Sequence, residues 1–298
     1  MRNWLKTLGL IVQHPLNRPR RTRALVNYAR WQIGSRLLPG TAAVPYVGPT
    51  RLLAKPGMTG VTGNVYCGLH EFEEMGFVLH ALRPGDLFLD VGANVGSYTV
   101  LAAGACGAAV VAVEPIPTTF RHLTDNVRLN AIEPLVELCN VGLGDRPGEL
   151  EFSADLDTVN HVLSGEERLR GGGVTVPVAT VDALLAGRSP TLVKIDVEGF
   201  ETQVVAGAGT TLGSPGLLAV LMELNGSGTR YGFDEEALHR KVLAYGFEAC
   251  AYAPLTRTLQ PSARRGTVSG NILYVRDLAG LRARVASAPS YAVHGVRL

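Results

Sequence analysis

The stretch that decides the fold reads Asp86-Leu-Phe-Leu-Asp90-Val-Gly92-Ala-Asn94-Val-Gly96-Ser-Tyr-Thr-Val100. A short apolar run ends in an acid, a turn with two glycines follows, and a helix begins. Open α/β sheets build nucleotide pockets with this order of elements, at the carboxyl end of a strand. The glycines do not form the G-x-G-x-x-G pattern that cradles a pyrophosphate, so the spacing does not favour a dinucleotide.

Two acids follow this first motif in a meaningful order. Asp90 lies two residues before Gly92, where its charge would oppose a pyrophosphate but suit the α-ammonium or sulfonium of S-adenosyl-L-methionine. Glu114 ends the next apolar run and can accept hydrogen bonds from both ribose hydroxyls. Either acid alone is equally well explained as an ordinary strand-end carboxylate. Asn140 and Val141, after a third apolar run, are predicted to meet the adenine.

Short apolar runs alternate with helical segments from Asp86 onward, which is typical of parallel strands joined by crossover helices. A single connecting helix is predicted over Phe200–Leu212, because its apolar residues share one face. The predicted strands are Leu87–Val91, Val110–Glu114, Leu135–Val141, Thr191–Val197 and Leu217–Glu223.

Two later runs, Phe247–Ala253 and Asn271–Arg276, predict an antiparallel hairpin that closes the sheet edge. The polar segment Thr256–Gly266 separates them. Between the third and fourth parallel strands, Glu149–Val181 contains short strands and a glycine run, and we predict a mobile excursion there.

Three segments together resemble the FkbM family of S-adenosylmethionine-dependent methyltransferases. They are Asp90–Gly96, Glu114-Pro115 and Lys194-Ile-Asp-Val-Glu-Gly-Phe-Glu201, supported by Met222-Glu223 and Gly270-Asn271. The resemblance covers about Asp86 to Arg276. It implies an α/β Rossmann-like class I methyltransferase sheet, mostly parallel with an antiparallel terminal strand, and O-methylation of a hydroxyl on a sugar, glycolipid or natural product.

The same reading assigns the binding of S-adenosylmethionine to a defined set of residues. They are Asp90, Gly92, Asn94, Gly96, Glu114, Asn140 and Val141.

The segment around the fourth strand supplies the candidate catalytic groups. Methyl transfer needs the acceptor held in line and a base that takes its proton. Asp196 is the first candidate for this base and Glu198 the second, with Lys194 tuning their charge or contacting substrate. The alternative is a structural ion pair with carboxylates at a helix start. His161, on the middle excursion, is a further candidate base, against the alternative of a solvated loop histidine.

A metal site is not predicted. Asp196, Glu198 and Glu223 could together bind a divalent cation, but three carboxylates at strand ends are weak evidence for one.

Charge is distributed unevenly along the chain. The net charge of the 298 residues is only +2, which argues against a nucleic-acid partner. Residues 1–40, however, contain eight Lys or Arg and no acid. A basic helix over Arg18–Arg36 either lies on an anionic membrane surface or caps the main domain with its charges solvated. The four cysteines lack a CxxC pair and there is no secretory or membrane-spanning pattern, so we expect a cytoplasmic protein, with peripheral membrane contact through residues 1–40 as an option.

The expected organisation is a basic N-terminal extension of helices and short strands with a lead-in helix (1–82), a methyltransferase domain (83–280) and a C-terminal tail (281–298). A small-molecule or glycan acceptor is expected, and the oligomeric state is open. Two alternatives remain: methylation of an amide or amine nitrogen, and a non-catalytic, membrane-associated protein that binds an adenosyl ligand.

Overall fold

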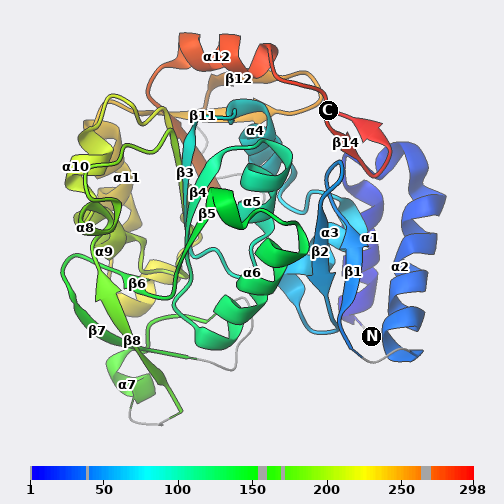
Figure 1. The fold of residues 1–298 in the computed structure, drawn as a ribbon, viewed down its shortest axis with the longest axis horizontal. Helices are drawn as coiled ribbons and strands as arrows, with labels where there is room; N and C mark the ends of the chain where they lie inside the picture. The colour runs from blue at the N-terminus through cyan, green and yellow to red at the C-terminus, as the bar shows by residue number, and fades with distance from the viewer. Residues whose placement is uncertain (1, 38–39, 154–159, 169–171, 263–269) are drawn as a thin grey trace.

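The computed structural model describes residues 2–37, 40–153, 160–168, 172–262 and 270–298. Its centre is an eight-stranded sheet with the strand order β12-β11-β13-β10-β9-β3-β4-β5. Helices cover both faces of this sheet (Figure 1). The α/β, Rossmann-like fold predicted from the sequence is confirmed.

The parallel part of the sheet contains five strands near the predicted positions. Four of them are buried on both faces, which explains their continuous apolar runs in the sequence, whereas β5 lies at the edge of the sheet and carries the exposed Glu137. Their register places Asp90 of β3 beside Ala112 of β4 and Lys194 of β9, so the polar strand ends meet at one edge. The strands are β3 (Leu87–Val91), β4 (Ala109–Val113), β5 (Val136–Cys139), β9 (Leu192–Ile195) and β10 (Ala219–Glu223).

The antiparallel part differs from the prediction at its edge. β11 (Glu248–Ala253) and β13 (Asn271–Val275) pair as expected, and β13 also pairs with β10. The edge itself is formed by β12 (Thr258–Pro261), which pairs with β11. The prediction that the β11–β13 hairpin closes the sheet was therefore wrong. The polar segment expected only to separate the two strands contains this strand, because an edge strand needs few apolar residues.

The predicted helix over Phe200–Leu212 is two helices, α9 (Glu201–Ala206) and α10 (Gly209–Gly213). At Gly207 between them, an added Cβ would lie 2.1 Å from the carbonyl oxygen of Gly144. The Asp182 carboxylate then accepts the backbone N–H groups of Thr210 and Thr211. This capping starts a new helix where the sequence pattern predicted continuity.

The remaining helices around the sheet enclose two apolar clusters, one on each face. They are α4 (Phe72–Ala81), α5 (Ser97–Val100), a π-turn (Leu101–Ala105), α6 (Pro117–Leu129), α8 (Val181–Leu185), α11 (Glu235–Ala244) and α12 (Leu278–Ala286), with 3₁₀ turns at Glu133–Leu135 and Ser227–Tyr231.

The middle excursion forms two strands of a small three-stranded sheet in the order β6-β8-β7, and the third strand, β6, comes just before it in the chain (Figure 1, lower left). The strands of this sheet are β6 (Gly142–Leu143), β7 (Gly148–Phe152) and β8 (Val174–Ala179), and the helix α7 (Gly165–Arg168) precedes β8. Phe152, Val162 and Val176 form its own apolar cluster with Ile116 of the main domain. The short strands expected here are confirmed.

The N-terminal residues form helices and one short hairpin that pack beside the central sheet (Figure 1, right). The expected basic helix begins later than predicted, at Arg21, because a 3₁₀ turn containing Pro19 precedes it. The elements are α1 (Arg2–Gln13), a 3₁₀ turn (Arg18–Arg20), α2 (Arg21–Leu37), β1 (Ala42–Pro45), β2 (Arg51–Ala54) and α3 (Thr59–Cys67).

The C-terminal residues return to this N-terminal segment. A hairpin of β14 (Ala292–Val293) and β15 (Val296–Arg297) forms a β-bridge between Val293 and Val47. The division of the chain at residues 82 and 280 remains a proposal, and its second boundary falls inside α12. No helix among the described residues is long and apolar enough to cross a bilayer.

Candidate functional site

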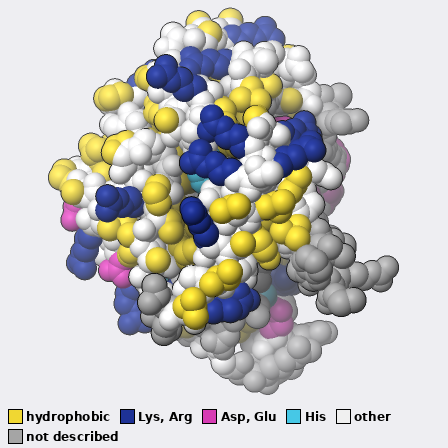
Figure 2. All heavy atoms as spheres, turned by 90° about the vertical axis from the view of Figure 1, so that its right-hand side faces the viewer, with side chains coloured by type: hydrophobic (Ala, Val, Ile, Leu, Met, Phe, Trp, Pro, Cys, Tyr) yellow, Lys and Arg dark blue, Asp and Glu magenta, His cyan; other side chains and the backbone are white. Residues whose placement is uncertain are grey.

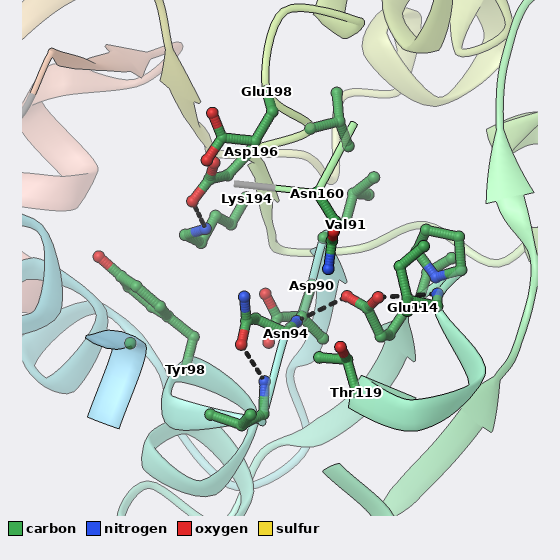
Figure 3. Close-up of a pocket in the computed structure, with 18 of the residues that line it drawn as sticks. Asp90, Val91, Asn94, Tyr98, Glu114, Thr119, Asn160, Lys194, Asp196 and Glu198 are labelled. Atoms are coloured by element: carbon green, nitrogen blue, oxygen red, sulfur yellow. Dashed lines mark hydrogen bonds and ion pairs between the residues drawn. The ribbon is translucent and has the colours of Figure 1, made fainter. Parts of the chain in front are cut away.

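A cavity of about 290 Å³ opens at the carboxyl ends of β3, β4, β9 and β10 (Figure 3). This is the sheet edge at which ligands bind in open α/β folds. Three of the predicted site residues, Gly96, Asn140 and His161, do not line it. Those that do are Asp90, Gly92, Asn94, Glu114, Val141, Lys194, Asp196 and Glu198.

The glycine turn after β3 is required by close packing. Gly92 has φ of +77°, and a Cβ added there would lie 1.8 Å from the backbone oxygen of Asp196. Gly96, with φ of +91°, is the N-cap residue just before α5, and an added Cβ there would meet Leu123 at 2.6 Å. Side chains rarely adopt such φ values, so both positions favour glycine. The motif therefore fixes how closely the β3 turn approaches β9.

Glu114 is buried and its carboxylate is held by main-chain donors. The N–H of Asn94 donates to Oε2 at 3.0 Å, and the N–H of Ile116 donates to Oε1 at 2.9 Å. Burial raises the pKa of Glu114 to about 7, although the two N–H groups favour its ionised form. Since a carboxylate oxygen accepts more than one hydrogen bond, both oxygens retain capacity toward the cavity.

Asp90 is fully buried and has one oxygen without a partner. Its Oδ2 accepts the hydroxyl of Thr99 at 2.7 Å, whereas Oδ1 has no hydrogen-bond partner among the described residues. Burial raises the pKa of Asp90, and the nearby Lys194 opposes this shift. An unsatisfied buried acceptor is costly. A cationic donor in the cavity would remove that cost.

Lys194 is the buried cation of the site. Its Nζ donates to Asp196 Oδ2 at 2.6 Å and lies 4.8 Å from the ring centre of Tyr98. Burial disfavours the ammonium, but the carboxylates of Asp196, Glu71 and Asp90 outweigh it, so the pKa of Lys194 is raised overall.

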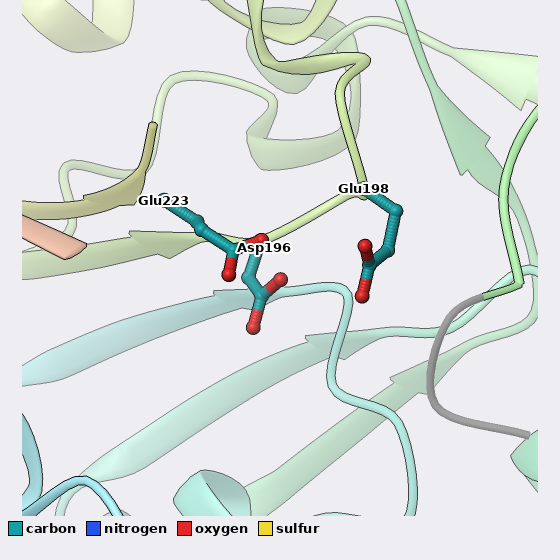
Figure 4. A group of neighbouring side chains, drawn as sticks. All are labelled: Asp196, Glu198 and Glu223. Carbon is teal, nitrogen blue, oxygen red and sulfur yellow. The ribbon is translucent and has the colours of Figure 1, made fainter. Parts of the chain in front are cut away.

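Glu198 and Glu223 extend toward the same side as Asp196 (Figure 4). One carboxylate oxygen from each of the three lies within 4.8 Å of the others. Burial and the neighbouring Asp196 raise the pKa of Glu198 to about 7. Burial together with Asp196 and Glu198 holds the pKa of Glu223 well above its usual range. Carboxylates crowded in this way retain protons that separated ones release.

The backbone around Glu198 is held in an unusual conformation. Glu198 has φ of +55°, and the carboxylate of Glu201 accepts the N–H groups of Val197 and Gly199 on either side of it. Strand β9 ends at Ile195, so strand alternation does not explain how Glu198 reaches the cavity. The turn fixed by Glu201 brings it there.

Comparison with known proteins identifies the family to which this chain belongs. The sequence model described as the Methyltransferase FkbM domain matches residues 90–250, more than half of the chain. The chain belongs to the FkbM methyltransferase family.

The curated relatives match parts of this FkbM chain. Hexuronic acid methyltransferase AglP from Haloferax volcanii is 30% identical over 148 residues, which are 48% of this chain and 58% of that protein. A tRNA(Phe) (4-demethylwyosine(37)-C(7)) aminocarboxypropyltransferase from Pyrococcus horikoshii is 34% identical over 67 residues, 22% of this chain and 24% of that protein. The FkbM chain thus spans little more than half the length of AglP.

Among solved structures, methyltransferase FkbM from Methylobacillus flagellatus KT shares 14% identity with a TM-score of 0.44, covering 85% of this chain and 60% of that one. A putative methyltransferase from Streptococcus mutans in complex with SAH shares 10% identity with a TM-score of 0.38, covering 67% of this chain and 93% of that one.

Asn140, predicted to meet the adenine, does not line the cavity. The amide of Asn140 donates to the carbonyl oxygens of Glu114 and Pro115 at 2.8 and 2.9 Å, so it holds the segment that carries Glu114. Only its neighbour Val141 lines the cavity.

His161 is 5% exposed, so the alternative of a solvated loop histidine was wrong. Its Nε2 lies 3.1 Å from Glu167 Oε1, and its neighbours Asn160 and Val162 line the cavity while His161 does not. The structure therefore does not place this candidate base on the cavity wall.

Sequence reasoning missed a polar group from outside the FkbM match. Glu71, at the start of α4, lines the cavity and accepts hydrogen bonds from the Tyr98 hydroxyl and the Asn271 amide at 2.7 and 2.8 Å. These partners are far apart in sequence, and no local pattern around Glu71 marks it. The Gly270-Asn271 signature was the one available signal, and it did not indicate what Asn271 binds.

Proposed function

We propose that this chain is an S-adenosylmethionine-dependent O-methyltransferase whose acceptor is a hydroxyl of a sugar or a sugar-bearing molecule. One observation carries the proposal. A single cavity places the buried acceptors of Asp90 and Glu114 beside a second set of carboxylates, those of Asp196, Glu198 and Glu223. We call Asp90, Asn94 and Glu114, the residues proposed to bind the methyl donor, the donor wall. We call Asp196, Glu198 and Glu223, the residues proposed to face the methyl acceptor, the acceptor wall.

The donor wall fits S-adenosylmethionine in charge and in hydrogen bonding. The partnerless Oδ1 of Asp90 suits an ammonium group, and Glu114 has oxygens left to accept ribose hydroxyls. Val141, at the carboxyl end of the third parallel strand, offers an apolar surface for the adenine. When bound, S-adenosylmethionine supplies an electrophilic methyl group.

The acceptor wall supplies the proton acceptor, and the geometry favours Glu198 over Asp196 for this role. Asp196 is engaged by Lys194 at 2.6 Å, which fixes its position and stabilises its charge. Within the described parts of the chain Glu198 forms no ion pair of this kind. Burial and Asp196 raise its pKa to about 7 against the opposing effect of Arg230 and Lys194, and this is near the value at which a general base works best at neutral pH. Glu198 therefore takes the proton of the acceptor hydroxyl, while Asp196 and Lys194 position it.

A sugar acceptor is supported by the chemistry of this wall and by one relative. Beside the acceptor wall, Glu71 and Asn160 bring further hydrogen-bonding groups to the cavity, and neighbouring hydroxyls of one sugar ring can donate to several such groups at once. The relative named hexuronic acid methyltransferase matches across 148 residues of this chain.

The experiment is a transfer assay with methyl-labelled S-adenosylmethionine. The purified chain is incubated with hexoses, hexuronic acids, sugar-bearing lipids and, in parallel, with peptide amines and amides. Labelled product from a hydroxyl acceptor, located by mass spectrometry, supports the proposal. Label on nitrogen overturns the acceptor class. Failure of the chain to bind either S-adenosylmethionine or its demethylated product in calorimetry overturns the proposal as a whole.

A further inference from the structure

The outward face of helix α2 is apolar along its middle. Leu25, Val26, Ala29, Ile33 and Leu37 are all exposed, with Ile33 at 59% and Leu37 at 73%. At 100° per residue these five positions fall within one side of the helix. An apolar stripe with this spacing usually faces a core. Here it faces outward.

Arginines border this stripe on both sides. On the helical wheel, Arg21 falls beyond one border and Arg23 and Arg30 fall beyond the other, while Arg36 falls within the stripe at its C-terminal end. All four are exposed, and none forms a salt bridge with an acidic residue in the described parts of the chain. The helix itself contains no acid.

The opposite side of α2 already satisfies the packing of the helix. Ala24 is buried there, the ring of Tyr28 lies 5.1 Å from that of Tyr66 on α3, and Gln32 donates to the Tyr66 hydroxyl at 2.9 Å. The outer face is therefore not needed to hold α2 on the protein.

Figure 2 shows the side of the molecule on which α2 lies. Hydrophobic and basic side chains are spread across this side, whereas the few acidic side chains in view lie toward its rim. Residues 1–40 contain eight Lys or Arg and no acid. The occupant of this surface must accordingly be negatively charged and must also accept apolar side chains.

We propose that the outer face of α2 docks on a bilayer surface that carries anionic headgroups. Leu25, Ile33 and Leu37 enter the boundary between headgroups and acyl chains, and the bordering arginines bind lipid phosphates. Arginine suits this role because its guanidinium pairs with phosphate in a bidentate manner. A second copy of the chain fits poorly, because self-pairing of this face would place arginines opposite arginines.

Vesicle co-sedimentation of the full chain tests the proposal. Vesicles of phosphatidylcholine alone are compared with vesicles that also contain phosphatidylglycerol. We expect binding to the anionic vesicles that weakens as salt is raised, and much weaker binding to the neutral ones. Equal binding to both vesicles, or binding to neither, overturns the proposal.

Two variants and their matched controls locate the surface. Arg21→Gln/Arg23→Gln/Arg30→Gln should weaken binding about fivefold for each arginine removed. The matched control is Arg240→Gln on α11, whose side chain is 61% exposed. A second variant, with its own control, removes apolar side chains of the stripe.

Leu25→Asn/Ile33→Asn should weaken binding about tenfold or more, because apolar burial is lost while the charge is kept. Its control is Leu255→Asn, at a site that is 56% exposed in the turn between β11 and β12. Circular dichroism verifies that each variant is folded. If the variants bind as tightly as the parent, or the controls lose as much, α2 is not the docking face. If the lipid-free chain is a dimer that Ile33→Asn dissociates, the face is an interface between copies and the proposal fails.

Discussion

The two walls of the cavity solve the problem of burying acids in different ways. On the donor wall, Glu114 is held by two main-chain N–H groups, and Asp90 is held by the Thr99 hydroxyl. On the acceptor wall, Asp196, Glu198 and Glu223 crowd one another, with Lys194 as the buried cation that contacts Asp196. The donor wall is thus preorganised by neutral donors, whereas the acceptor wall holds charge under repulsion. Neutral hydrogen-bond donors that are already in place suit the binding of a cofactor, because they do not change protonation state. Crowded carboxylates suit proton transfer, because their repulsion makes it easier for one of them to take a proton.

The largest expected effect tests the acceptor wall. Glu198→Gln keeps the size of the side chain but removes the base, so the rate of methyl transfer should fall about 100- to 10,000-fold, while affinity for the methyl donor stays within about twofold. The measurement is single-turnover kinetics with calorimetry of donor binding. The exposed Glu149→Gln is the control.

The pH dependence of that activity has a definite sign. Because the base must be ionised, activity of the parent should fall as pH drops below the pKa of Glu198, about 7. Glu198→Gln should lose this limb of the profile. If Glu198→Gln keeps both the parent rate and the loss of activity at low pH, another group takes the proton of the acceptor hydroxyl. Asp196 is then the next candidate to test.

The contact between the walls comes second. Gly92→Ala adds a Cβ against the Asp196 backbone oxygen at a positive φ, so the free energy of unfolding should fall by about 2–5 kcal/mol in urea denaturation. Gly34→Ala in α2 is the control, since no atom lies within 4 Å of its added Cβ. It should be stabilising by about 0.5–1 kcal/mol. Similar losses at both glycines would contradict the steric account of the motif.

A smaller effect is expected on the donor wall. Glu114→Gln retains the shape but loses the negative acceptor, so affinity for S-adenosylmethionine should weaken about tenfold in calorimetry. The exposed Glu248→Gln on β11 should bind as the parent does. If Glu114→Gln binds S-adenosylmethionine as tightly as the parent, Glu114 does not bind the ribose. The proposed contrast between the two walls would then be wrong.

The smallest expected effect concerns how the repulsion among the carboxylates of the acceptor wall changes the stability of the fold with pH. In the folded chain the pKa of Glu223 is held well above its usual range, so the folded state retains a proton that the unfolded state releases. The free energy of unfolding therefore falls as pH rises through this range. Glu223→Gln should reduce this fall by on the order of 1 kcal/mol between about pH 4.5, the usual pKa of a glutamate, and about pH 9. Parallel pH curves for parent and variant would show that the acceptor wall is not strained.

The same contrast explains what the sequence could predict. The donor wall comes from two short segments, so Asp90, the glycine turn and Glu114 could be recognised by local spacing. Four of the parallel strands were predictable because burial on both faces gives each of them a continuous apolar run, which the edge strand β5 with its exposed Glu137 lacks. Asn140 was recognised but its role was not, since its amide binds carbonyls that lie 25 and 26 residues away.

The acceptor wall depends on contacts that spacing does not encode. Glu71 reaches its partner Asn271 across 200 residues, and Glu198 reaches the cavity through a turn fixed by Glu201 after its strand has ended. The split of α9 from α10 has the same cause, because Asp182 caps α10 from 28 residues away. Strand β12 stayed hidden because an edge strand needs few apolar residues.

The approach of Gly92 to the backbone of Asp196 also limits how the cavity can be re-engineered. Main chain meets main chain at that point, so no side-chain exchange can widen the gap between the two walls. Space for a bulkier acceptor has to be gained where side chains form the boundary, at Phe152 of β7, at Val162, which forms a β-bridge with it, or at Met75 of α4. Libraries directed at those three positions would vary acceptor choice while leaving the spacing of the two reacting partners unchanged.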